Sequence, residues 1–121
     1  MVRAPAPGGL GQPLISVARG DIWLTALDPT IGSEIQKTRP CVIISPPEMH
    51  NHLRTVLAAP MTTGNRSAPF RIHVRFEGKA GLILLDQIRA LDKQRLVKRL
   101  GAIDARTLHV MLGRLQDVFA E

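Results

Sequence analysis

Two short segments of this sequence combine side chains that stabilise a negatively charged phosphate. Arg39 stands directly before Pro40, and Thr62 and Thr63 close an apolar run. A residue before proline is driven toward extended backbone, and proline is tolerated at the first position of a strand, so we expect the arginine at a sheet edge. Its guanidinium is always charged and offers five donors in a planar fork. Arginine and hydroxyl groups together predict a site that binds phosphate and stabilises charge developing on it.

Further polar groups flank these two segments, and we predict that they bind the same ligand. They are a serine and a carboxylate ahead of the arginine, an arginine after the threonines, and an amide and an arginine after a later buried run: Ser33, Glu34, Arg66, Gln87 and Arg89. Judged singly, each group also has a plain structural interpretation. Arg39 alone would be read as a surface arginine, and Thr62 and Thr63 as a polar strand end.

Metal chemistry is not indicated by the histidines and the cysteine. The four histidines are scattered at His50, His52, His73 and His109, and Cys41 is the single cysteine, so no set has metal-ligand spacing. We therefore expect no metal and no cofactor. His50 and His52 lie in a polar stretch and are expected to be exposed, whereas Cys41 lies in an apolar run and is expected to be buried.

A site of arginines and hydroxyls without a metal suits the cleavage of RNA. RNA carries its own nucleophile, the 2′-hydroxyl, so the protein need only align it, shift a proton and stabilise the developing charge. DNA lacks this hydroxyl and would be inert to the same groups.

The charge of the chain also favours a polyanion as partner. Its 121 residues carry a net charge of +6, with twelve arginines against four lysines. Aromatic residues make up only 3% of the chain, so affinity for RNA should come from phosphate contacts and not from base stacking. Residues 71–76 predict a strand with basic side chains at alternate positions. These side chains could form a solvated face or an RNA-binding face, and the sequence favours neither interpretation.

The length predicts one domain, which we place at residues 19–121. Residues 1–18 are rich in proline and glycine and are expected to form a flexible leader. The chain has no apolar run of about 18 residues, so we expect no membrane contact and a cytoplasmic location.

Strand patterns dominate the first two-thirds of the domain. They cover residues 21–27, 41–44, 55–61, 71–76 and 82–85, with a turn at 78–81. The run 41–44 has no alternation, which predicts a strand buried on both faces. Residues 96–103 fit either a strand or a helical turn.

A C-terminal helix is predicted after Asp104, a good N-cap. Apolar residues recur at helical spacing on one face, at Leu108, Met111, Leu112, Leu115, Val118 and Phe119. The fold class is therefore mainly β with α (α+β), a compact and partly closed antiparallel sheet capped by a helix.

The ordered set of motifs resembles the MazF/PemK toxins of bacterial toxin–antitoxin pairs. The segments that carry this resemblance are residues 19–23, 28–29, 32–34, 39–40, 45–46, 60–63, 85–89 and 92–95. The resemblance implies a small SH3-like antiparallel barrel, a homodimer, and an mRNA interferase, a metal-independent and sequence-specific endoribonuclease. Its products would be 2′,3′-cyclic phosphate and 5′-hydroxyl ends, and a cognate acidic antitoxin would be its partner.

Carried over by position, Arg39 and Thr62 are similar to the catalytic arginine and threonine of that family. Ser33 and Glu34 match the loop motif beside the site, and Gln87 matches a polar position after the later strand. Because the pKa of a guanidinium is very high, charge stabilisation by Arg39 is favoured over proton transfer. The alternative from another class is a CcdB-like toxin that poisons DNA gyrase, or a non-catalytic binding module of the same fold.

Overall fold

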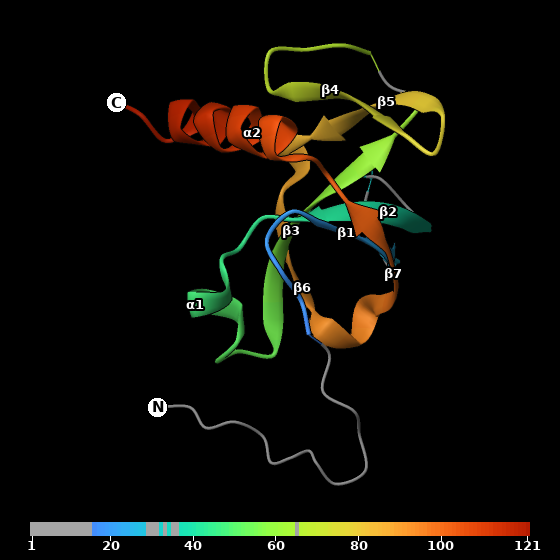
Figure 1. Cartoon of the computed structure of the whole chain (residues 1–121), viewed down its shortest axis with the longest axis vertical. Helices are drawn as coiled ribbons and strands as arrows, with labels where there is room; N and C mark the ends of the chain where they lie inside the picture. The colour runs from blue at the N-terminus through green and yellow to red at the C-terminus, as the bar shows by residue number, and fades with distance from the viewer. Residues whose placement is uncertain (1–15, 29–31, 33, 35–36, 65) are drawn as a thin grey trace, which may run out of the picture.

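The computed structural model describes residues 16–28, 32, 34, 37–64 and 66–121, and seven strands in this part of the chain form one antiparallel sheet (Figure 1). The strands are β1 (Asp21–Ala26), β2 (Thr38–Ile43), β3 (Thr55–Thr62), β4 (Arg71–Phe76), β5 (Lys79–Leu84), β6 (Arg89–Asp92) and β7 (Leu96–Ala102). The helical segments are α1 (Pro47–His50), η1 (Leu85–Gln87), η2 (Lys93–Arg95) and α2 (Ala105–Val118). The strand order is β4-β5-β3-β2-β1-β7, and β6 pairs with β3. The predicted strands are confirmed, and the ambiguous stretch 96–103 forms β7.

Strand β2 is buried on both faces, as its unbroken apolar run predicts. Val42 faces one hydrophobic cluster, whereas Cys41 and Ile43 face another that includes Trp23. The first cluster lies under α2 and joins Ile22, Val42, Ile44, Ala59, Met61, Ile72, Ile83, Leu85, Met111 and Leu115. The second lies on the opposite face and joins Val17, Trp23, Leu27, Cys41, Ile43, Val56, Ala58, Leu91 and Leu96. Cys41 and Trp23 are therefore core residues, as expected.

The sheet curves into a half-barrel because its strands bend and change partners. Strand β3 pairs with β2 and β6 along most of its length, but its last two residues pair with β5. The pairing of β1 with β7 shifts register twice, after Ile22 and after Leu24, and such irregularities increase strand twist. Helix α2 lies beside β4 and β5 at one end of the half-barrel (Figure 1). The predicted α+β fold class is confirmed.

Helix α2 begins where predicted. A carboxylate oxygen of Asp104 accepts a hydrogen bond from the Thr107 backbone N–H at 2.7 Å, which satisfies one of the helix's first unpaired donors. Met111 and Leu115 are buried in the core, but Val118 and Phe119 are 40% and 75% exposed. The apolar face is thus only partly covered within this chain, because Val118 and Phe119 belong to neither core cluster.

The predicted turn at residues 78–81 is wrong in its extent. Glu77 and Gly78 both have positive φ, 54° and 78°, which is the geometry of a two-residue hairpin turn, and β5 already starts at Lys79. Gly81 lies inside the strand because the chain passes close to another strand there. A Cβ atom at this position would lie 2.8 Å from the carbonyl oxygen of Thr62.

The prediction that His50 is exposed is also wrong. His50 is 1% exposed, and both ring nitrogens are hydrogen bonded, Nδ1 with Ser45 Oγ at 2.8 Å and Nε2 with the Val17 carbonyl at 2.7 Å. The Leu57 backbone N–H donates to the same serine oxygen at 3.1 Å. His50 is therefore a structural residue that fastens α1 and the start of β3 to the chain ahead of β1, and His52 is exposed as expected.

The packed domain begins slightly earlier than residue 19. Val17 is 5% exposed, belongs to the second core cluster and gives its carbonyl to His50. Residues 1–15 lie outside the described residues, so the flexible leader remains a prediction.

Candidate functional site

Arg39 and Thr62 lie on neighbouring strands at the same end of the sheet. The paired positions of β2 and β3 run from Ile43↔Ala58 to Cys41↔Pro60. Two residues further along each strand, this register brings Arg39 level with Thr62. Because side chains alternate along a strand, both residues belong to the same face as the Cys41–Pro60 pair. Each is half-buried, at the rim of the second core cluster.

Thr62 is held in place by its own turn and by β5. Its hydroxyl oxygen accepts a hydrogen bond from the Gly64 N–H at 3.2 Å, so the hydroxyl can still donate its proton to a ligand. Its backbone pairs with Leu82. Its carbonyl oxygen would lie only 2.8 Å from a Cβ atom at position 81, where the chain has glycine. The threonine hydroxyl is thus presented from a fixed piece of backbone at a strand end.

A second guanidinium, that of Arg89, lies on the same face of the sheet. Arg89 is the first residue of β6 and pairs with Ala58, which alternates with Pro60 and Thr62 along β3. Its charge also acts on Cys41: burial raises the pKa of that thiol to about 11, and the nearby Arg89 opposes the rise. Arg39 and Arg89 therefore place two positive charges on one face of the sheet, Arg39 level with Thr62 and Arg89 beside Cys41.

The loop between β1 and β2 is fastened at its base. The Leu27 N–H donates to the Lys37 carbonyl at 3.0 Å, and Asp28 Oδ1 accepts from the Lys37 N–H at 2.9 Å. Arg95 adds two hydrogen bonds from Nη1, to the carbonyls of Ala26 at 3.0 Å and Asp28 at 2.6 Å. These bonds hold the two ends of the loop next to the start of the strand that carries Arg39.

Two predicted site residues belong to that loop. Glu34 is exposed, and its position between the fastened loop ends keeps it in the segment ahead of Arg39. Ser33 lies outside the described residues. The role of Ser33 therefore stays a prediction.

The remaining predicted residues lie on the two connections beside Thr62. Thr63 and Arg66 are exposed in the connection from β3 to β4, and Gln87 is half-buried at the end of η1. Asp86 in η1 forms an ion pair with Arg71, the first residue of β4, whose closest atoms are Nη2 and Oδ2 at 2.9 Å. The hydrogen bond from Arg71 is the main cause that holds the pKa of Asp86 below its ordinary value.

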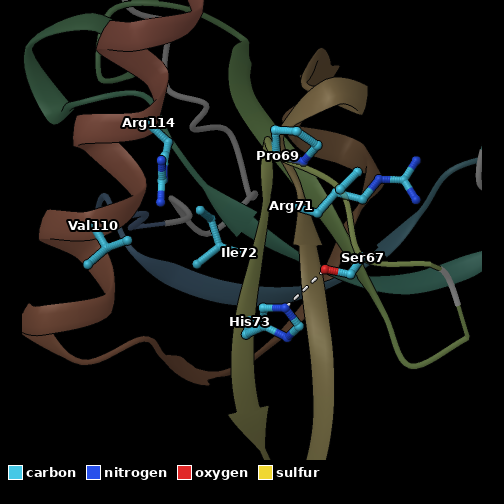
Figure 2. Close-up of a pocket in the computed structure, with 8 residues that line it drawn as sticks. Ser67, Pro69, Arg71, Ile72, His73, Val110 and Arg114 are labelled. Atoms are coloured by element: carbon cyan, nitrogen blue, oxygen red, sulfur yellow. Dashed lines mark hydrogen bonds between the residues drawn. The ribbon is translucent and has the colours of Figure 1, made fainter.

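A groove of about 600 Å³ lies between β4, the preceding loop and α2, and Arg71 is among the residues that line it (Figure 2). Ile72 and Val110 give it apolar walls, and Arg114 contributes a charge. His73 shares a hydrogen bond of 3.2 Å with Ser67, so this part of the loop is tied to the strand. The polar side chains of β4 can therefore be either a solvent-exposed surface or a surface that binds RNA, and neither interpretation is excluded.

No group of three or more histidine, cysteine, aspartate or glutamate side chains among the described residues could hold a metal ion. In the same part of the chain, no helix has the length and apolar character needed to cross a membrane.

Comparison with known proteins decides the family. Residues 18–119 match the family described as the PemK-like, MazF-like toxin of type II toxin–antitoxin systems. The chain belongs to this family. It is 37% identical over 106 residues to the endoribonuclease PemK of Escherichia coli, a match that covers 83% of this chain and 80% of that protein.

Solved structures of similar proteins share the fold. The crystal structure of MazF from Deinococcus radiodurans superposes with a TM-score of 0.74 at 26% identity, covering 88% of this chain and 97% of that one. A mycobacterial endoribonuclease in complex with its cognate antitoxin superposes with a TM-score of 0.71 at 22% identity, covering 84% and 93% of the two chains.

The ion pair between Arg71 and Asp86 is the feature of this region that sequence reasoning missed. A signal for it was present in Gly78, because glycine favours the positive φ that a two-residue hairpin turn requires. Placing the turn there fixes the register of β4 against β5 and sets Arg71 opposite Leu84, two residues from Asp86. The misplaced turn at 78–81 hid this proximity.

Proposed function

We propose that this protein is the toxin of a type II toxin–antitoxin pair and that it cleaves single-stranded RNA without a metal. The observation that carries the proposal is that Arg39 and Thr62 lie level at one end of the sheet, with the Arg89 guanidinium on the same face. Family membership supports it, because the curated relative from Escherichia coli is an endoribonuclease. The alternative of a gyrase-poisoning or non-catalytic module is not favoured, since it gives these side chains no role.

The proposed chemistry is attack of the RNA 2′-oxygen on the adjacent phosphorus. The bond from phosphorus to the 5′-oxygen breaks, which leaves a 2′,3′-cyclic phosphate and a 5′-hydroxyl, and the proton lost by the 2′-hydroxyl is balanced by the one gained at the 5′-oxygen. Thr62 donates a hydrogen bond from its hydroxyl to a phosphate oxygen and keeps its proton, and Arg39 stabilises the negative charge that grows on the phosphorane.

The other predicted residues are proposed to bind the substrate. Arg89 adds a second cation near the reacting phosphate, and Gln87 offers amide groups for hydrogen bonds with a base. Thr63 and Arg66 extend the surface along the β3–β4 connection, whereas Ser33 and Glu34 extend it along the β1–β2 loop. Because RNA is the proposed substrate, we place the protein in the cytoplasm, where its action would arrest growth.

The proposed partners are a second copy of the chain and an acidic antitoxin. Val118 and Phe119 at the end of α2 are exposed in the single chain, which favours a homodimer that covers them. An acidic segment would compete with RNA for the same guanidinium forks. A mycobacterial structural neighbour is solved with its antitoxin, which supports such a complex here. Its association should slow as salt rises, because screening removes electrostatic steering.

The test is cleavage of a single-stranded RNA in EDTA, with a DNA of the same sequence as the inert substrate. We expect cleavage of the RNA only, with cyclic phosphate ends, and a loss of roughly a hundredfold or more in Arg39→Ala. Thr62→Ala should also lose activity. Arg106→Ala, which removes an exposed arginine of α2, is the matched control and should cleave normally. Cleavage that requires added divalent metal, or a folded Arg39→Ala protein with full activity, would contradict the proposal.

A further inference from the structure

A single arginine outside the predicted site joins three segments of the chain. Arg71 on β4 donates from Nε to Asp86 Oδ1 at 3.0 Å and from Nη2 to Asp86 Oδ2 at 2.9 Å. From Nη1 it also donates to the Arg66 carbonyl at 3.0 Å. The same guanidinium therefore ties η1, which contains Asp86, and the β3–β4 connection, which contains Arg66, to strand β4. We call this arrangement the Arg71 tether.

We propose that Arg71 is a positioning residue for RNA cleavage, which fixes the two connections beside Thr62 without contacting the RNA itself. This inference rests on the proposed function. It follows from where the tethered atoms lie in the chain. Asp86 immediately precedes Gln87, and the Arg66 carbonyl belongs to a residue proposed to bind substrate.

The tether acts where the backbone alone provides few restraints. Among the described residues, two backbone hydrogen bonds outside the regular elements fasten these connections: the Leu85 N–H donates to the Phe70 carbonyl at 3.1 Å, and the Arg71 N–H donates to the Ala68 carbonyl at 3.0 Å. Beyond them, residues 66–68 have no regular secondary structure. The planar fork of arginine adds restraints in direction as well as distance, which a single point charge does not.

The directions of the donors favour positioning over direct RNA binding. Three of the five guanidinium donors are aimed at protein acceptors, and the side chain is only 19% exposed, against 42% for Asp86. Arg71 lines the same groove as His73 and Arg114, but Figure 2 shows its side chain extending away from them, and its fork is hydrogen bonded to Asp86 and to the Arg66 carbonyl. An arginine that bound RNA phosphate would need its fork directed at solvent.

The test compares Arg71→Gln, Arg71→Lys, Asp86→Asn and the double variant Arg71→Gln/Asp86→Asn in the EDTA assay, with kcat and KM measured at several salt concentrations. We expect each single variant to lower kcat by about tenfold with KM within about twofold, since small misplacements at a reacting site are costly. Lysine should not rescue, and the double variant should be no slower than either single variant, because one interaction is lost in all of them. Arg106→Gln controls for the loss of one charge.

Hydrogen exchange of the backbone amides gives a second readout. The tether predicts faster exchange in residues 66–68 and 85–88 of Arg71→Gln, with the core strands unchanged.

A raised KM with a shallower salt dependence would show that Arg71 binds phosphate and would overturn the proposal. Unchanged kcat in a folded but less stable variant would reduce the pair to a structural role, and a much larger loss in Asp86→Asn would place that carboxylate on the substrate. Wild-type protein that fails to cleave RNA refutes the proposed function and the tether with it, whereas wild-type cleavage with unimpaired Arg71→Gln refutes the tether alone.

Discussion

Replacing Gly81 by alanine should displace Thr62. The added Cβ would lie 2.8 Å from the Thr62 carbonyl oxygen, and ordinary van der Waals contact begins at 3.4 Å, so the two strands must separate by about 0.6 Å. The atom that blocks the methyl group belongs to the backbone, which cannot rotate aside as a side chain can. Overpacking of this kind costs about 1–3 kcal/mol, and alanine returns about 0.5–1 kcal/mol by restricting the unfolded chain. We therefore expect a net destabilisation of about 1–2 kcal/mol.

Activity should fall further than stability predicts. Thr62 presents the hydroxyl proposed to hold the phosphate, and misplacement by a fraction of an ångström reduces the rate of an aligned reaction. Cleavage of RNA by Gly81→Ala should be slower by about tenfold at a temperature at which the variant is fully folded. Thermal unfolding gives the stability and a fluorescent RNA gives the rate.

Gly113→Ala is the matched control. That glycine lies in the interior of α2, and a Cβ added to it would meet no atom within 4 Å, so alanine there should stabilise the protein by up to about 1 kcal/mol and leave cleavage unchanged. If Gly81→Ala were as stable and as active as the wild type, the close approach of β5 to Thr62 would not constrain the site, and the reasoning would be refuted.

Two further predictions concern the groups that hold the domain together. His50→Ala should destabilise the protein by about 2–4 kcal/mol in chemical unfolding, because it leaves buried partners of both ring nitrogens unsatisfied, while His52→Ala should have little effect. The pKa of Asp86 is lowered in the folded protein by the hydrogen bond from Arg71, so its contribution to stability is present above the unfolded pKa of a carboxyl group and is lost as pH falls through the folded value. Asp86→Asn should therefore flatten the acid side of the stability profile measured by thermal unfolding, and a profile parallel to the wild type would contradict this.

Features set by local pattern could be predicted from the sequence. The alternation in residues 71–76, the unbroken apolar run at 41–44 and the cap at Asp104 each specify their element through neighbouring residues alone, and the structure has β4, β2 and α2 at these places. The position of Arg39 and Thr62 at one end of the sheet follows from the pairing of β2 with β3, whereas the family resemblance implied an SH3-like barrel without a strand order.

Features that depend on distant partners could not be predicted. His50 lies in a polar stretch, and its burial depends on the Val17 carbonyl, 33 residues away in sequence. The residues around Gly81 predict a turn. Glycine is needed at this position because the carbonyl oxygen of Thr62 on the neighbouring strand leaves no space for a Cβ atom. Strand β6 is short and mixed in character, and it is a strand because Arg89–Asp92 pairs with β3. In each case a long-range contact outweighs the local pattern.

The pairing of β1 with β7 has a consequence for synthesis on the ribosome. Strand β1 emerges first, yet one of its two edges is closed only by residues 96–102, at the far end of the domain. Until those residues are made, the chain exposes an unpaired strand edge, and the closure of so long a loop favours slow, all-or-none folding. A chain that ends before β7 therefore lacks the strand that pairs with the second edge of β1. In a protein proposed to destroy RNA, such a topology would delay activity until the last strand of the domain has been made.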